Sequence, residues 1–238
     1  MKAMIFAAGL GTRLKPFTNN KPKALAEVNG VTLLERNIGY LKSFGINEFI
    51  VNVHHFPDQI LNLLKENENY GCKIHISDET EQLLETGGGL KKATPVLDGQ
   101  EPFVVMNVDI LTDLDIASML DYHQRHKPMV TLAVTKRTTS RYFLFNDKNE
   151  LCGWKNTKSG EEKVVKDEPE LEEKAFSGIH IIEPDFLHMI SQEGKFSIVE
   201  VYLELCKNQK ILGFDHSNGI LIDVGKPEAV NEAEKLFK

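Results

Sequence analysis

The segment KAMIFAAGLGTRLKP, residues 2–16, joins an apolar run to a glycine-rich turn. The run Lys2–Ala7 is rich in residues that favour strands, and the turn follows it directly. Gly9 and Gly11 let backbone N–H groups approach phosphate oxygens, where a side chain would obstruct them. Open α/β sheets bind ligands at the carboxyl ends of their strands. The segment therefore predicts a first sheet strand that ends in a phosphate-binding turn.

Strand-like and helix-like runs alternate through the first half of the chain. Further runs with the composition of strands are Glu48–His54, Lys73–Ser77, Phe103–Val108 and Met129–Lys136. Helices are expected from a capping-box pattern at Thr32 to Gly45, from Pro57, over Gly89–Val96 and over Asp113–His126. This order predicts an α/β fold with a Rossmann-like, mostly parallel open sheet, right-handed crossovers and flanking helices.

The pattern changes after Arg137, where short strand candidates are separated by polar stretches. These candidates are Tyr142–Phe145, Glu150–Trp154, Lys163–Lys166 and Ala175–Ile182. They are followed by helices over Asp185–Ser191 and Ile198–Lys207, strands over Ile211–Phe214 and Gly219–Val224, and a helix from Pro227. We expect a single domain over 1–238, with a core over 1–136, a small β-rich lid over 137–183, and a return to the core over 184–238.

Charge and hydropathy exclude several classes of protein. The 238 residues include 28 basic and 35 acidic side chains, which gives a net charge of −7. This balance argues against a protein that coats nucleic acid or binds anionic membranes, because both depend on excess positive charge. A bound nucleotide remains compatible, since one phosphate site needs only a few local cations. No apolar run is long enough to span a membrane, and the N-terminus lacks the apolar core of a signal peptide.

The cysteines indicate the cellular compartment. Cys72, Cys152 and Cys206 are widely spaced and form no CxxC pair. They predict neither a disulfide framework nor a zinc site, and they favour the reducing cytoplasm. The expected partners are small molecules, with no nucleic acid and no membrane, and the chain length is compatible with a monomer.

The N-terminal turn matches neither common nucleotide-binding loop. It lacks the GxxxxGK[ST] pattern of a Walker loop, and Leu14 occupies the third glycine position of the dinucleotide fingerprint. Its distinctive feature is cationic, since Arg13 lies within the loop and Lys23 just beyond it. Both could face a triphosphate. The alternative is a tight turn that carries two solvated cations.

Two further motifs suggest chemistry. Asp109 follows the most apolar strand candidate, so its carboxylate would project into the ligand crevice as a Mg²⁺ ligand, or else cap a helix. Asp113 and Asp115 are expected to start the following helix. Residues 84–90, LETGGGL, carry three glycines that would let a flat base lie against the backbone. The alternative for these glycines is a glycine-rich helix start.

The N-terminal motif resembles that of the nucleoside-diphosphate-sugar pyrophosphorylases, also called sugar-1-phosphate nucleotidyltransferases. Their signature, AAGxGTRLxPxT…PKxL, is matched from Ala7 to Leu25, and IDVGKPE at 222–228 resembles a second family segment. The resemblance implies that Arg13, Lys23, Asp109 and Asp223 are catalytic and that Asp109 and Asp223 bind Mg²⁺. The nucleotide contacts it implies are Ala8, Gly9, Gly11, Thr12, Arg13, Lys23, Thr86, Gly87 and Gly88.

Two segments resemble one branch of this family, the N-acetylmuramate-1-phosphate uridylyltransferases. They are the LETGGG run and Phe176–Ile179, FSGI. The resemblance implies UTP and N-acetylmuramate 1-phosphate as substrates, a lid that binds the sugar, and a role in cell-wall recycling. Asn107, Val108, Ser177 and Gly178 are its sugar contacts. Val108 replaces a family glycine, and no Glu-Lys-Pro sugar element is present, for which Lys163, Lys166 and Lys174 are the available substitutes.

Three alternatives remain open from the sequence. A guanylyltransferase for mannose or heptose 1-phosphate would use the same loops. A non-catalytic protein that binds nucleotide sugars is disfavoured because it would not need all four charged residues. A dinucleotide-dependent redox enzyme is disfavoured by Leu14 and by the absence of an acidic residue placed to bind ribose.

Overall fold

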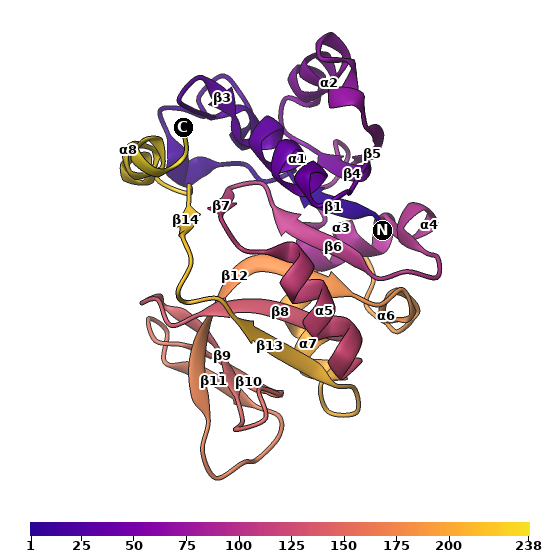
Figure 1. The fold of residues 1–238 in the computed structure, drawn as a ribbon, viewed down its shortest axis with the longest axis vertical. Helices are drawn as coiled ribbons and strands as arrows, with labels where there is room; N and C mark the ends of the chain where they lie inside the picture. Colours follow the sequence, from indigo (N-terminus) through magenta and orange to yellow (C-terminus); the bar gives the residue numbers. More distant parts are fainter.

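A ten-stranded sheet runs the length of the molecule in the computed structural model, which describes residues 1–238 (Figure 1). Its main path is β11-β10-β9-β12-β6-β1-β4-β5, and β8 and β13 extend it from β12. The strands are β1 (Ala3–Phe6), β4 (Glu48–Val53), β5 (Lys73–Asp78), β6 (Phe103–Asn107), β8 (Val130–Thr135), β9 (Arg141–Phe145), β10 (Leu151–Asn156), β11 (Glu161–Val164), β12 (Glu172–Ile182) and β13 (Ile211–Asp215).

The half of the sheet that carries the N-terminal turn is parallel. β6, β1, β4 and β5 pair in parallel, and so do β8 and β13. The carboxyl ends of these neighbouring strands therefore meet at one edge. The predicted α/β class with a mostly parallel sheet is confirmed.

Helices cover both faces of the sheet, each over its own apolar cluster. On one face lie α1 (Leu33–Ser43), α2 (Pro57–Glu66), α5 (Ile116–His126) and α8 (Pro227–Leu236). On the other lie α3 (Glu85–Lys92), α4 (Thr94–Leu97), α6 (Asp185–His188) and α7 (Ile198–Leu205). Short 3₁₀ turns cover Thr12–Leu14, Lys23–Leu25 and Glu68–Gly71. The central strands β1, β4, β6 and β8 are almost wholly buried between the two layers, which explains their largely apolar sequences.

β12 connects the β-rich lid to the core. Its first residues pair with β9 of the lid, and Ile179–Ile182 pair antiparallel with β6. A β-bulge lies between Phe176 and His180, where β12 also pairs with β8. The strands of the predicted lid are therefore continuous with the main sheet.

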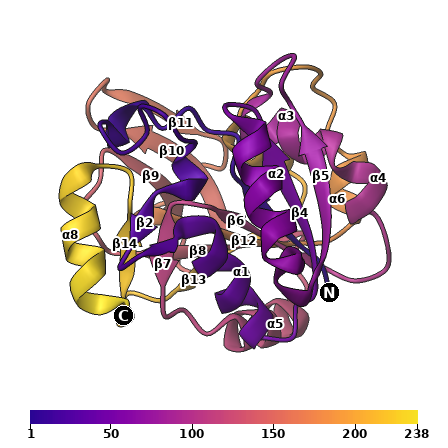
Figure 2. The same ribbon diagram turned by 90° about the horizontal axis from the view of Figure 1, so that it is seen from above.

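Two small antiparallel pairings outside the main sheet were not predicted. β2 (Glu27–Val28) pairs with β3 (Val31–Thr32), and β7 (Ile110–Thr112) pairs with β14 (Leu221–Asp223). Helix α8 lies beside β2 (Figure 2). The β7–β14 pair matters most for function, because it returns the end of the chain to the edge where β6 ends.

Helix starts differ in detail from the prediction. Thr32 caps α1 by accepting a hydrogen bond from the Glu35 amide at 3.2 Å, as the capping-box pattern predicted. Asp115 caps α5, but Asp113 lies before that helix and accepts from the Ile220 amide at 2.6 Å. The predicted helix over 89–96 is wrong in its start, since α3 begins at Glu85 and includes all three glycines.

No helix is long and apolar enough to cross a membrane. All three cysteines are free thiols, and two of them are buried.

Candidate active site

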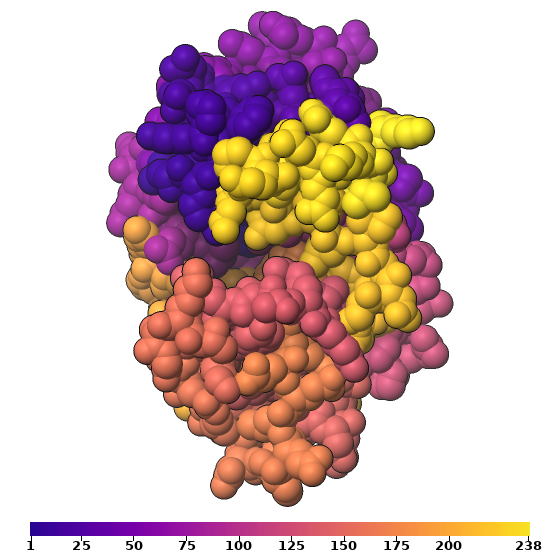
Figure 3. Space-filling view, turned by 90° about the vertical axis from the view of Figure 1, so that its left-hand side faces the viewer, coloured from indigo at the N-terminus to yellow at the C-terminus, as the bar shows by residue number.

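A cavity of about 360 Å³ opens where β1, β4 and β6 end. It contains seven of the residues that the sequence predicted: Ala8, Gly9, Lys23, Thr86, Asn107, Val108 and Asp109. Phe6, Asn52, Glu79, Leu83 and Glu85 complete its walls. The space-filling view shows a hollow between the N-terminal residues above and the β9–β12 region below (Figure 3). The parallel topology thus gathers side chains that lie a hundred residues apart in sequence.

The N-terminal turn is tightly folded and leaves three backbone amides without a partner. Gly11 has φ +63°, and a Cβ there would lie 2.9 Å from the Thr18 side chain and 3.0 Å from that of Lys23. The Thr18 hydroxyl donates to the Gly11 carbonyl at 2.8 Å and closes the loop. The amides of Gly9, Leu10 and Gly11 donate no hydrogen bond within the protein, so they are available to phosphate oxygens. Thr12 and Arg13 follow on the exposed surface, whereas Leu14 is fully buried in the core.

Lys23 and Asp109 form an ion pair at the floor of the cavity. Their side chains are 11% and 15% exposed, so water screens the pair only in part. The Asp109 carboxylate holds the Lys23 ammonium beside the space that a substrate phosphate would enter.

Asp223 is brought to Asp109 by the β7–β14 pairing. Its register partner is Ile110, and the Val224 amide donates to the Asp109 carbonyl at 2.8 Å. Partial removal of water and the neighbouring Asp109 carboxylate raise the pKa of Asp223, although Lys23 and Arg13 oppose this. Two carboxyl groups therefore face each other with a cation on either side.

Arg13 approaches the same pair from a second cavity of about 410 Å³, which Asp223 and Gly225 also line. A Cβ on Gly225 would lie 2.7 Å from an Asp223 oxygen and 3.4 Å from the Arg13 guanidinium. Glycine at this position leaves room for both groups. The four residues predicted as catalytic thus lie in one neighbourhood, although Arg13 and Asp223 line the second cavity and not the first.

The donor set suits a hard divalent cation. Asp109 and Asp223 offer carboxylate oxygens, the ligand type that Mg²⁺ prefers, and substrate phosphates commonly complete such a shell. Burial and the repulsion between the two carboxylates both raise the pKa of Asp223, and a cation between the carboxylates would relieve the repulsion. No group of three or more His, Cys, Asp or Glu side chains is arranged to hold a metal by itself.

The residues of the glycine-rich motif differ in their position relative to the cavity. Thr86 lines the cavity, and its hydroxyl accepts from the Ile198 amide at 3.0 Å. Gly87 and Gly88 are buried within α3, and their amides donate to the Phe196 carbonyl at 3.0 and 3.4 Å. A Cβ on Gly87 would lie 2.4 Å from the Phe196 ring. These two glycines allow close packing of the helix against residues 194–196, and neither lines the cavity.

Only some of the predicted sugar contacts lie at the cavity. Asn107 and Val108 line the cavity, and Gly178 packs against the Asn107 side chain. Ser177 is fully buried, and its hydroxyl is hydrogen-bonded to His216 at 2.7 Å. Ser177 therefore acts within the protein, as a link between β12 and the segment after β13.

The family resemblance implies that Gly178 contacts the sugar, and on that basis its replacement by alanine should weaken sugar binding. Gly178 has φ +76°, and a Cβ would lie 2.7 Å from the Asn107 amide nitrogen, so Asn107 must move. We expect the KM for the sugar 1-phosphate to rise at least about fivefold, with the KM for the nucleotide little changed. Gly160→Ala is the matched control, since it shares a positive φ of +73° but meets no atom within 4 Å. Equal effects of the two variants would remove Gly178 from the sugar site.

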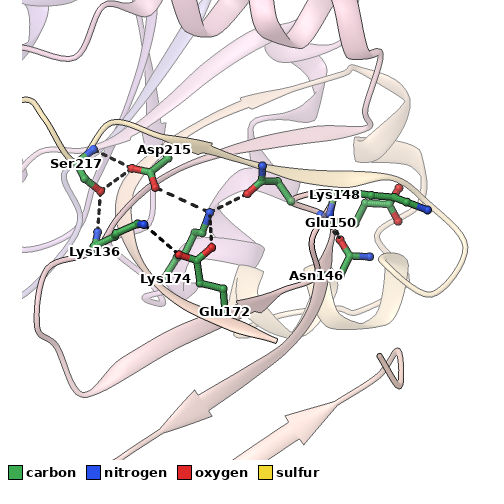
Figure 4. A network of polar contacts seen from close by, with 9 residues as sticks. Lys136, Asn146, Lys148, Glu150, Glu172, Lys174, Asp215 and Ser217 are labelled. Carbon is green, nitrogen blue, oxygen red and sulfur yellow. Dashed lines mark hydrogen bonds and ion pairs between the residues drawn. The ribbon is translucent and has the colours of Figure 1, made fainter. Parts of the chain in front are cut away.

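The lysines considered as substitutes for the missing sugar element do not reach the cavity. Lys174 is 4% exposed, and its ammonium contacts Asn149 at 2.7 Å, Glu172 at 3.1 Å and Asp215 at 3.9 Å (Figure 4). Lys163 and Lys166 pair with Glu161 and Glu150 on the lid. Lys174 instead joins the lid to β13, so it is not a substitute for the Glu-Lys-Pro sugar element.

The sequence interpretation missed two buried polar residues of the cavity. Asn52, on β4, is 3% exposed, and Glu79, just after β5, is 1% exposed. The Asn52 amide nitrogen donates to the Glu79 carboxylate at 2.8 Å. One signal was available, because Asn52 is a polar side chain in the otherwise apolar end of a strand, FIVNV.

Known proteins resemble the whole chain. The family model described as nucleotidyl transferase matches residues 2–238. The N-acetylmuramate alpha-1-phosphate uridylyltransferase of Caulobacter vibrioides is 32% identical over 98% of this chain and 95% of its own length. The mannose-1-phosphate guanyltransferase of Aspergillus oryzae is 31% identical over 96% of this chain but 62% of its own length. The crystal structure of HddC from Yersinia pseudotuberculosis, complexed with GMP-PN, superimposes with a TM-score of 0.79 at 21% identity, covering 100% of this chain and 99% of that one.

Proposed function

The chain belongs to the nucleotidyl transferase family and is an enzyme of the sugar-1-phosphate nucleotidyltransferase type, and we propose that the cavity beside Lys23 and Asp109 is its active site. The reaction joins a nucleoside triphosphate to a sugar 1-phosphate and releases pyrophosphate. The observation that carries this assignment is the cluster of two cations and two carboxylates beside a loop whose amides are free to bind phosphate.

The mechanism is a direct displacement at the α-phosphorus. An oxygen of the sugar phosphate forms a bond to that phosphorus, and the bond to the leaving pyrophosphate breaks. A phosphate monoester with a second pKa of about 6 is already mostly dianionic at neutral pH, so the nucleophile needs no strong base. The barrier lies in bringing two anions together in line, which calls for cations and positioning.

Each charged residue has a role in that scheme. Lys23 and Arg13 neutralise the triphosphate from two sides, and the Gly9–Gly11 amides orient it. Asp109 and Asp223 would hold Mg²⁺, which when bound adds positive charge at the reacting phosphates. Lys23 is kept in place by Asp109, so the cation is positioned before substrate enters.

UTP and N-acetylmuramate 1-phosphate are the substrates we favour. The support is the Caulobacter relative, which this chain matches over nearly the full length of both proteins, while the guanyltransferase is matched over less than two thirds of its length. GTP with mannose or heptose 1-phosphate is the second candidate, on the strength of the Aspergillus relative. A cytoplasmic setting agrees with the free thiols.

A substrate matrix tests this choice. Four nucleoside triphosphates are combined with N-acetylmuramate, mannose, glucose and heptose 1-phosphates, and pyrophosphate release is followed with Mg²⁺ present. We expect the highest kcat/KM for UTP with N-acetylmuramate 1-phosphate. A higher value for GTP with mannose 1-phosphate would transfer the assignment to the second candidate. Tight binding of nucleotide sugars without pyrophosphate release in any combination would favour a non-catalytic binding protein.

A further inference from the structure

Asn52 and Glu79 connect the two walls of the nucleotide cavity. One wall is the N-terminal loop, which leaves β1 at Ala7 and Ala8. The other is formed by Leu83 and Leu84 and by the first residues of α3, Glu85 and Thr86. β4 lies between them in the sheet, and β5 leads into Glu79. The pair thus lines the cavity at the place where both walls begin.

Every polar atom of the two side chains is engaged. The Asn52 side-chain oxygen accepts from the amides of Ala7 at 2.6 Å and Ala8 at 3.2 Å. Its nitrogen donates to one Glu79 oxygen at 2.8 Å, and the other Glu79 oxygen accepts from the Leu84 amide at 3.0 Å. A single chain of hydrogen bonds therefore runs from the phosphate loop to the start of α3.

The order of donors and acceptors along these hydrogen bonds fixes the orientation of the Asn52 and Glu79 side chains. Asn52 cannot turn its amide over without placing its nitrogen against the Ala7 and Ala8 amides, which are also donors. Glu79 forms no ion pair, so its carboxylate is held only by N–H donors. Gly89 leaves the space for this arrangement, because a Cβ there would lie 2.7 Å from a Glu79 oxygen and 3.2 Å from the Asn52 nitrogen.

We propose that Asn52 and Glu79 are a positioning pair for the nucleotide, which sets the phosphate loop and the segment before α3 at the separation and orientation that a bound triphosphate requires. The proposal rests on the assignment of this cavity as the nucleotide site. A buried carboxylate without a cation is costly to the fold, and its placement between the two walls accounts for its presence.

Single substitutions break the donor–acceptor pattern. Glu79→Gln sets an amide donor against either the Asn52 nitrogen or the Leu84 amide, whichever way it turns. Asn52→Asp sets two carboxylates against each other. Either change leaves a buried polar group unpaired, so we expect the KM and Kd for the nucleoside triphosphate to rise at least about tenfold. The KM for the sugar 1-phosphate should change less than about threefold, since neither side chain contacts that part of the site.

The double variant Asn52→Asp/Glu79→Gln restores a complete set of hydrogen bonds. The bond between the two side chains now runs from position 79 to position 52. The carboxylate introduced at position 52 accepts from the backbone amides of Ala7 and Ala8 and from the side-chain nitrogen introduced at position 79. The side-chain oxygen at position 79 accepts from the Leu84 amide. We expect it to return the nucleotide KM and Kd to within about threefold of the wild-type values. Asn146→Asp is the matched control: this lid residue also accepts from two amides, at 3.1 and 2.9 Å, and donates to a glutamate, Glu168, at 3.3 Å. It should leave nucleotide binding unchanged.

Nucleotide Kd measured by calorimetry, together with melting temperature, distinguishes the outcomes. Single variants that melt earlier but bind nucleotide normally would overturn the proposal, as would a double variant no better than the singles. If a single variant fails to fold, the Kd of the double variant decides. A wild-type protein that binds nucleotide but releases no pyrophosphate would count against the proposed function, while the pair would still be tested by its Kd values.

Discussion

Asp109→Asn and Asp223→Asn should each lower kcat at least about a hundredfold at fixed Mg²⁺, the scale of losing a key electrostatic group in an active site. Each change removes one negative charge from the pair that faces Lys23 and Arg13. It also replaces a carboxylate oxygen with a much weaker ligand for a hard cation. Initial rates of pyrophosphate release over a range of Mg²⁺ concentrations measure the effect, and partial recovery at high Mg²⁺ would indicate weakened metal binding.

Asp115→Asn is the control for these variants. Asp115 lies in the same segment as Asp109 but caps α5 outside the cavity, and asparagine caps helices about as well as aspartate. Its turnover should match that of the wild-type protein. Near-normal turnover of both Asp109→Asn and Asp223→Asn would show that the carboxylate pair does not bind the metal used in the reaction.

Lys23→Ala should mainly reduce turnover, by about a hundredfold or more. The Lys23 side chain is 11% exposed and is paired with Asp109, so its charge is poorly screened. In the proposed mechanism this charge would lie beside the developing charge of the leaving group. The KM for the sugar 1-phosphate should change little. Steady-state kinetics with each substrate varied in turn separates the two parameters.

Lys21→Ala is the matched control, because Lys21 lies two residues away and forms an exposed ion pair with Glu27 at 2.7 Å. Surface pairs of this kind contribute little to stability, and this one is outside the cavity. If Lys23→Ala changed only the sugar KM and left kcat intact, Lys23 would belong to the sugar site.

The fold and one wall of the site could be predicted because local pattern determines them. The apolar run ending in Gly9 and Gly11 and the buried strand ending before Asp109 each contain their own signal. In a parallel sheet, such strand ends meet at one edge. Asp223 was suggested only by resemblance to a family segment, since nothing local shows that β14 pairs with β7.

The remaining residues depend on contacts between distant parts of the chain. Gly87 and Gly88 pack against Phe196 and Gly194, more than a hundred residues away, and no local pattern separates such glycines from those that contact a base. Ser177 and Lys174 look like surface polar residues until β13 and His216 cover them. Asn52 and Glu79 acquire their role only when β4 and the residues after β5 lie side by side.

The position of a radioactive label after one turnover tests the central claim most directly. UTP labelled at the α-phosphorus or at the γ-phosphorus is incubated with Mg²⁺ and N-acetylmuramate 1-phosphate, and the products are separated. Transfer of a nucleotidyl group places the α-label in the nucleotide sugar and the γ-label in pyrophosphate in equal amounts, and Asp109→Asn should suppress both. A γ-label in a phosphorylated sugar or in orthophosphate would contradict nucleotidyl transfer at this site.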